Sequence, residues 1–157
     1  MILILTQCFP SRIGGIENLM FNLSYFLGKS NKVIVLADQH NFIKDTIFDN
    51  KFKKNFLVRR FSGIKYFRKR NKLKELKNIL KYQDVKVIIS DSWKSLEIPM
   101  QKMQNKKLPS ICLVHGNELI IKNNKHHQRI KNTLKNVNKI VSNSQYTKNL
   151  LKKISTE

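Results

Sequence analysis

The chain has 157 residues, of which 41% are hydrophobic, so its length and composition suit one domain with an ordinary buried core. No segment reaches the roughly 18 uninterrupted apolar residues of a membrane-spanning helix, and the first residues lack the basic segment and cleavage site of a signal peptide. We therefore expect a cytoplasmic protein that is soluble or attached only at the membrane surface.

The formal net charge of +21 suits an anionic partner such as nucleic acid, an anionic membrane or an acidic substrate. Lysine greatly outnumbers arginine, however, and lysine, asparagine and isoleucine are abundant together, a bias typical of an AT-rich genome. The sequence also lacks the patterns of zinc fingers, helix-turn-helix domains and RNA-binding aromatic motifs, so nucleic acid is the least favoured partner. Cys8 and Cys112 are solitary and are predicted to be reduced thiols rather than a disulfide or a metal site.

The first 38 residues predict a β-α-β unit with a glycine-rich turn. Unbroken apolar runs at residues 2–5 and 33–37 indicate strands buried on both faces, and the segment between them has apolar residues at helical spacing. Gly14 and Gly15 lie where the loop turns into this helix, so they permit positive φ and a close approach of a ligand to the backbone. Exposed N–H groups there could hold an anion, but a tight turn without a ligand explains the glycine pair equally well.

Further along the chain, residues 41–55 are polar and are predicted to be irregular or briefly helical, and a third strand follows at 56–61. A lysine-rich helix is predicted over 64–83, with one apolar face made of Leu73, Leu76, Ile79 and Leu80. Strands at 86–90, 110–114 and 139–142 alternate with helices at 93–104, at 125–136 and after residues 143–147. About six strands separated by helices predict a doubly wound α/β fold, a parallel sheet with helices on both faces.

The strand predicted at 110–114 ends in His115-Gly116-Asn117-Glu118. Open α/β sheets bind ligands at the carboxyl ends of their strands, so this tetrapeptide is a candidate binding site. A lone histidine more often bonds a nearby backbone carbonyl, but Gly116 and Glu118 beside His115 favour a site. Glu118 itself could bind a ligand hydroxyl or pair with a lysine, and Glu17 could simply complement the dipole of its helix.

Three motifs, in this order, resemble family 4 glycosyltransferases, which have the GT-B fold. They are Gly14-Gly15-x-Glu17, His115-Gly116-x-Glu118 and Ser142-Asn143-Ser144. The resemblance covers residues 1–157 and implies the N-terminal, acceptor-side domain, one half of a GT-B fold. The C-terminal domain of such enzymes, which holds the nucleotide sugar, has no counterpart in this sequence.

The resemblance implies transfer of a sugar from a nucleotide-diphosphate donor to a glycan or lipid-linked acceptor, as in polysaccharide biosynthesis. It implies retention at the anomeric carbon, with no metal and no cofactor beyond the donor. Gly14 and Gly15 would donate N–H groups to the donor diphosphate as the interdomain cleft closes. His115 would be the catalytic residue beside the reacting sugar, and Gly116, Asn117 and Glu118 would bind the acceptor. We expect no transfer by this chain alone unless a separate chain supplies the C-terminal domain.

The sequence departs from the family pattern after the fourth predicted strand, where many members have histidine and this chain has Ser90-Asp91-Ser92-Trp93. Trp93 could stack on a sugar, but a core position beside Leu96 is favoured. An alternative function is a non-catalytic, basic α/β module that associates with anionic membrane or nucleic acid. The predicted helix at 64–83 could rest on anionic lipid, although an ordinary lysine-rich surface helix is slightly favoured.

Overall fold

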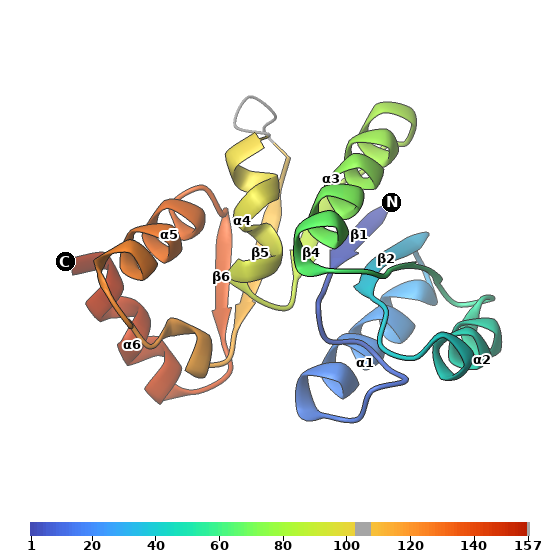
Figure 1. Cartoon of the computed structure of the whole chain (residues 1–157), viewed down its shortest axis with the longest axis horizontal. Coiled ribbons are helices and arrows are strands. Elements are labelled where there is room, and N and C mark those ends of the chain that lie inside the picture. The colour runs from blue at the N-terminus through green and yellow to red at the C-terminus, as the bar shows by residue number, and fades with distance from the viewer. Residues whose placement is uncertain (103–107, 157) are drawn as a thin grey trace. The chain divides into compact units, whose positions relative to one another are not determined.

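Figure 1 shows the computed structural model of the chain, which describes residues 1–102 and 108–156. Its strands form a six-stranded sheet in the order β3-β2-β1-β4-β5-β6, with parallel pairing of β1 with β2, β2 with β3 and β5 with β6. This confirms the predicted doubly wound α/β fold. The chain divides into two compact units, a first unit of Met1–Ile88 and a second unit of Ile89–Glu157.

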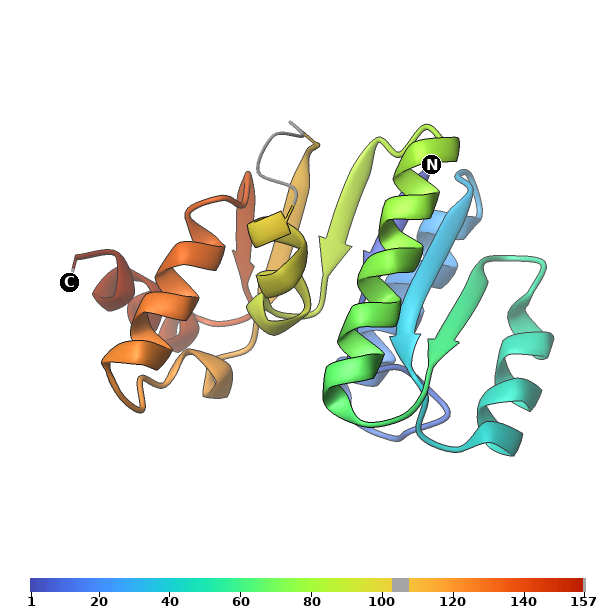
Figure 2. The same ribbon diagram turned by 45° about the horizontal axis from the view of Figure 1, so that its top comes forward.

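The first unit contains the predicted β-α-β segment with its glycine-rich turn, followed by two more helices and two more strands. Its elements are β1 (Ile2–Leu5), α1 (Gly15–Gly28), β2 (Val33–Asp38), α2 (Phe42–Phe52), β3 (Leu57–Phe61), α3 (Lys65–Tyr82) and the start of β4 (Val87–Ser90). β1 and β2 are buried along their whole length, as expected of strands covered on both faces. In Figure 2, α3 lies in front of these strands and α1 behind them.

The second unit continues the α/β pattern. After β4 come α4 (Trp93–Lys102), β5 (Ser110–Val114), the short 3₁₀ helix η1 (Asn117–Leu119), α5 (Asn124–Leu134), β6 (Lys139–Ser142) and α6 (Gln145–Thr156). The bounds predicted for the strands at 110–114 and 139–142 are confirmed. The helix η1 was not predicted, and the end predicted for the helix at 93–104 lies outside the described residues.

Of the two alternatives expected over 41–55, the irregular one is wrong and the helical one is confirmed, because α2 covers 11 of these residues. Asn41 caps its N-terminus, accepting a hydrogen bond from the Lys44 amide at 3.0 Å. Phe48 and Phe52 lie one turn apart, with ring centroids 4.9 Å from each other, and pack into an aromatic cluster with Phe9, Phe21, Tyr25 and Phe56. The buried residue of α2 is Asp45. Because this carboxylate takes an inner position where a helix normally has an apolar residue, the sequence of α2 does not show a regular apolar spacing.

The helix α3 confirms the prediction over 64–83 to within one residue at each end. Leu76 and Ile79 are buried, and Leu73 and Leu80 are half-buried, so the predicted apolar face belongs to the core. Among the described helices, we find none that is both long enough and apolar enough to cross a membrane.

Candidate functional site

The glycine-rich turn after β1 takes a different backbone conformation from the predicted one. Gly14 precedes α1 with φ 171° and ψ 166°, which is extended backbone, and Gly15 is the first residue of the helix. The glycines with positive φ are Gly63 and Gly116 instead. The expectation that Gly14 and Gly15 serve to permit positive φ is therefore wrong, because an extended residue followed by a helix makes this turn without it.

The two glycines differ in the space around them. A Cβ on Gly14 would lie 2.2 Å from Glu17 Oε2, whereas a Cβ on Gly15 would have nothing within 4 Å. Glu17 is buried, and its Oε1 pairs with Arg12 Nε at 3.1 Å. No side chain caps the N-terminus of α1. The open approach to the helix N-terminus therefore lies on the Gly15 side, and the carboxylate of Glu17 occupies the Gly14 side.

A buried aspartate of α2 holds the loop that leads to these glycines. Asp45 Oδ1 accepts hydrogen bonds from the amide and the hydroxyl of Ser11, at 3.2 and 2.7 Å. Its Oδ2 accepts from the amides of His40 and Asn41 at 2.9 and 3.1 Å. One side chain thus fixes both the loop after β1 and the start of α2.

Arg60 of β3 completes this buried network. Its guanidinium makes two hydrogen bonds to Asp49, at 3.0 and 2.7 Å, and lies 3.6 Å from Asp45 Oδ1. It also donates to the carbonyls of Pro10 and Asp38 and lies over the Phe9 ring. The arginine therefore ties the loop after β1 to α2 and to the end of β2.

Two cations of α3 bind the carboxylate at the end of β2. Lys72 Nζ lies 2.6 Å from Asp38 Oδ1 and donates to the Thr6 carbonyl at 2.8 Å, and Arg68 Nε lies 2.9 Å from Asp38 Oδ2. Neither charged group, the one around Asp45 and Arg60 or the one around Asp38, was predicted from the sequence. A signal for them was available, since Asp38 ends an apolar strand and Arg60 interrupts another.

The hydrogen bonds to Asp45 predict a specific dependence of stability on pH. Burial alone raises the pKa of Asp45, but the bonds from His40, Ser11 and Asn41 and the charge of Arg60 outweigh burial and lower this pKa below its ordinary value. A carboxyl with a lowered pKa stabilises the fold above its unfolded pKa of about 4, and this stabilisation is lost as the pH falls through the folded pKa. We expect the free-energy difference of unfolding between wild type and Asp45→Asn to be largest near neutral pH and to shrink in acid. Urea unfolding from pH 7 downwards measures it.

The exposed Asp84 provides the matched control for this pH dependence. Asp84→Asn should leave the acid dependence of the free energy of unfolding as it is in wild type. If the free energies of unfolding of wild type and Asp45→Asn differed by the same amount at every pH, the charge of Asp45 would not have the stabilising role assigned to it.

In the second unit, the residues after β5 form a compact turn around His115. The His115 amide donates to Glu118 Oε1 at 2.6 Å, and the ring Nε2 lies 3.0 Å from the Asp91 carbonyl. A carbonyl oxygen only accepts, so Nε2 carries the proton and Nδ1 of the neutral ring is an acceptor. The carboxylate of Glu118 thus closes the turn through the His115 amide, an interaction that neither sequence interpretation of Glu118 included.

Gly116 is the position in this turn that requires glycine. Its φ is 110°, and a Cβ would lie 3.2 Å from Thr147 Oγ1 and 3.7 Å from the Tyr146 ring. Thr147 Oγ1 in turn donates to Asn143 Oδ1 at 2.9 Å, and the Thr147 amide donates to Ser144 Oγ at 3.1 Å. The His115-Gly116 turn and the Asn143-Ser144 segment, two motifs far apart in the sequence, therefore lie together within the second unit.

Trp93 and Asp91, in the segment after β4, contact the same turn. Trp93 is fully buried beside Leu96, which confirms the favoured core position, and its indole N–H donates to the Glu118 carbonyl at 2.9 Å. Asp91 is also buried and accepts from Ser95 Oγ at 2.6 Å. Burial, together with the charges of Asp91 and Glu118, raises the pKa of the free Cys112 thiol to about 12, which favours the protonated thiol over the nucleophilic thiolate.

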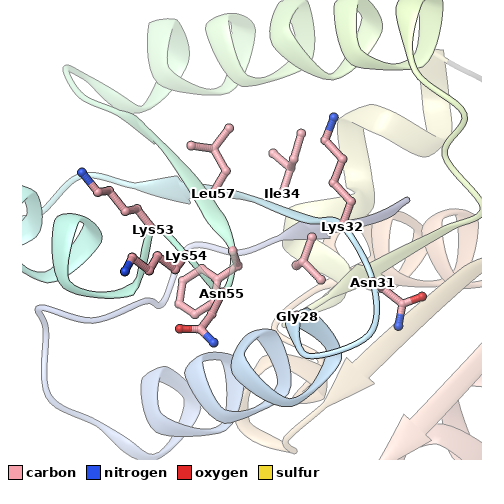
Figure 3. A pocket seen from close by; sticks show the side chains of 10 residues that line it. Gly28, Asn31, Lys32, Ile34, Lys53, Lys54, Asn55 and Leu57 are labelled. Carbon is pink, nitrogen blue, oxygen red and sulfur yellow. The ribbon is translucent and has the colours of Figure 1, made fainter.

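A surface pocket of the first unit lies at the amino ends of β2 and β3, whereas the glycine turn follows the carboxyl end of β1. Figure 3 shows Lys53 and Lys54 extending to one side of this pocket, with Lys32 on the other side and directed away from them. Such side chains do not converge on an anion, so the pocket is not the candidate site. Among the described residues, we find no group of three or more His, Cys, Asp and Glu side chains arranged to hold a metal ion.

Comparison with known proteins gives a match at the level of structure. No protein-family model matches the chain, and no curated protein matches it. The fold is similar to the crystal structure of Anabaena Alr3699/HepE in complex with UDP, with a TM-score of 0.67 and 13% sequence identity. The match covers 98% of this chain and 40% of the other, so this chain spans less than half the length of the protein that it resembles.

Proposed function

We propose that this chain is the N-terminal, acceptor-side half of a retaining glycosyltransferase of family 4. It would help move a sugar from a nucleotide-diphosphate donor to a glycan or lipid-linked acceptor. The observation that supports this most is the match of nearly the whole chain to part of a protein crystallised with UDP. The glycine turn after β1 and the His115 turn after β5 add support, because both follow the carboxyl ends of parallel strands.

In this proposal Gly15, rather than Gly14, offers the better contact for the donor diphosphate. The first amides of α1 point out of a helix N-terminus that no side chain caps, and the space beside Gly15 is open. The partial positive charge of the helix N-terminus would stabilise the diphosphate as the sugar leaves. The carboxylate of Glu17 lies beside Gly14 and would repel a diphosphate there, although its ion pair with Arg12 offsets part of this negative charge.

His115 would contact the acceptor through Nδ1. Because Nε2 is used on the Asp91 carbonyl, Nδ1 is the ring atom able to accept a hydrogen bond from a sugar hydroxyl. Gly116 and Asn117 would add backbone and amide contacts, while Glu118 would act by holding the turn through the His115 amide. A second domain, in the same polypeptide or in a separate chain, would supply the nucleotide-sugar site, so no transfer is expected from these residues alone.

The donor contact can be tested by titrating the ¹⁵N-labelled chain with UDP and following its amide resonances. We expect the largest shifts at Gly15 and Ile16, and a clear loss of affinity in Gly15→Ala, because the added methyl group occupies the open space without touching the protein. Asn124→Ala, at the first position of α5, is the control and should bind UDP like wild type. Shifts that avoid α1 at saturating UDP, or equal binding by Gly15→Ala, would contradict the donor assignment.

The same preparation tests the expected lack of activity. The isolated chain, incubated with labelled nucleotide sugars and glycan or lipid-linked acceptors, should release only background amounts of product. Transfer above background would show that these residues form a complete enzyme, contrary to the proposal.

A further inference from the structure

The second unit has two large aromatic side chains, and the structure places them in opposite environments. Residues 89–157 contain no tryptophan, tyrosine or phenylalanine other than Trp93 and Tyr146. Trp93 is buried, so the aromatic residue that the sequence suggested for stacking on a sugar does not face a ligand. Tyr146, the second residue of α6, is 61% exposed. An aromatic contact between this unit and a ligand would therefore be made by Tyr146.

The ring of Tyr146 lies against the His115 turn. A Cβ on Gly116 would be 3.7 Å from Cε1 and 3.8 Å from Cδ1 of this ring. These are ordinary van der Waals distances, so the ring packs beside the backbone of Gly116 with no side chain between them. The helix α6 also contacts η1, which continues the turn, and Figure 1 shows the two helices next to each other. The exposed ring therefore borders the turn that contains His115.

Hydrogen bonds fix the backbone that carries Tyr146. The Thr147 amide donates to Ser144 Oγ at 3.1 Å, and Thr147 Oγ1 donates to Asn143 Oδ1 at 2.9 Å. Thr147 is fully buried, although its neighbour Tyr146 is exposed. The first turn of α6 is thus anchored in the unit, and a tyrosine side chain loses little conformational entropy when a ligand orders it.

The surface around the His115 turn combines apolar and hydrogen-bonding groups. Ile120, whose amide donates to the Asn117 carbonyl at 3.4 Å, is 47% exposed and adds apolar surface. Asn117 is exposed, and its side-chain amide can both donate and accept. A pyranose has hydroxyls around its edge and C–H groups on its faces. It therefore requires the combination that this turn presents, a few placed polar groups beside an aromatic surface.

We propose that Tyr146 is the platform on which a hexopyranose ring of the acceptor stacks, while His115 and Asn117 bond the hydroxyls of that sugar. This inference deepens the proposed function and rests on it, because the proposed function makes the ligand of the His115 turn an acceptor. It also narrows the acceptor to a class. The group that binds here is a sugar ring, attached to a glycan or to a lipid, rather than the alcohol or phosphate of a lipid without a sugar.

Three variants separate stacking from other roles of the tyrosine. Tyr146→Ser removes the ring from an exposed position, so the core of the second unit is kept. Tyr146→Phe keeps the ring and removes its hydroxyl. Tyr82→Ser is the control, because Tyr82 is 74% exposed at the C-terminal end of α3 and belongs to the first unit. Single exposed tyrosines are ordinary on protein surfaces, and the control measures what such a residue contributes.

The probes are methyl β-glucopyranoside, which has a pyranose ring, and glucitol, which has comparable hydroxyls on an open chain. Saturation-transfer NMR measures the weak binding of each, and the amide shifts of the ¹⁵N-labelled chain locate it. In wild type we expect the glycoside, but not glucitol, to shift the amides of Gly116 and Asn117. Tyr146→Ser should bind the glycoside about tenfold more weakly, the loss expected from one stacked ring and the surface it covers. Tyr146→Phe and Tyr82→Ser should bind it like wild type.

Four results would overturn the platform. Wild type could fail to respond to the glycoside, or Tyr146→Ser could bind it as well as wild type does. Tyr146→Phe could lose as much affinity as Tyr146→Ser, which would assign the contact to the hydroxyl rather than to the ring. Glucitol could shift the same amides as strongly as the glycoside, which would leave no part for the face of a sugar ring.

Titration of the same samples with UDP keeps this inference separate from the donor assignment. Tyr146→Ser should bind UDP like wild type, because Tyr146 is not among the proposed donor contacts. UDP shifts at Gly15 without glycoside shifts at Gly116 would support the donor contact and overturn the platform. Glycoside shifts without UDP shifts would contradict the donor contact and support the platform as a sugar site.

Discussion

Replacing Arg60 with methionine should lower the free energy of unfolding by about 3–5 kcal/mol, the usual cost of removing one partner from a buried ionic group. Methionine keeps most of the length of the side chain, so the loss reports the charge and its hydrogen bonds rather than a large cavity. Asp49 and Asp45 would lose their guanidinium partner, and the Pro10 carbonyl would lose its donor. Urea denaturation followed by circular dichroism measures the change.

The neighbouring residue on the same strand provides the control for Arg60. Arg59 pairs with Glu75, but 39% of its side chain is exposed, so Arg59→Met should cost at most about 1 kcal/mol. Similar losses from Arg59→Met and Arg60→Met would show that the buried network contributes little beyond an ordinary surface ion pair.

Replacing Trp93 with alanine should destabilise the second unit by about 3–5 kcal/mol, as expected when a fully buried tryptophan leaves a cavity. The indole also donates to the Glu118 carbonyl, so the variant should loosen the His115 turn as well as the core. Urea denaturation gives the loss of stability, and hydrogen exchange of the His115 amide, which donates to Glu118, reports the turn.

Trp93→Phe separates the two contributions of the indole. It keeps an aromatic ring in the core and removes the N–H donor, so we expect a smaller loss of stability, of about 1–3 kcal/mol, with faster exchange still seen at the His115 amide. If His115 exchanged at the wild-type rate in both variants, the indole would have no part in holding the turn.

The sheet could be predicted from the sequence because its strands are short apolar runs. The residues of β2 from Val33 to Ala37 are apolar and all buried, so burial alone explains their composition. The sequence left open whether 41–55 is helical or irregular, because the inner face of α2 holds the carboxylate of Asp45 where an apolar residue would signal a helix. That carboxylate is stable inside only through partners from three other segments, which no local pattern reveals.

The candidate sites could likewise be predicted from the sequence only in part. The sequence located both turns, because glycine, histidine and glutamate at strand ends are uncommon without a reason. It did not predict which glycine has positive φ. Gly14 makes its turn with extended backbone, whereas Gly116 has a φ of 110°. Nor could it predict that Asp38 and Lys72 meet, because both belong to types that usually remain in water.

The bonds from Asp45 to Ser11 and from Arg60 to Pro10 have a consequence for the entropy of binding. A long glycine-containing loop normally loses conformational freedom when a ligand orders it, and this loss weakens the affinity. Here folding already restricts much of this freedom. The Pro10 carbonyl is bonded to Arg60, the Ser11 amide is bonded to Asp45, and Arg12 is paired with Glu17. A ligand that reaches Gly15 would therefore meet a loop largely in place, and more of its contact energy would remain as affinity.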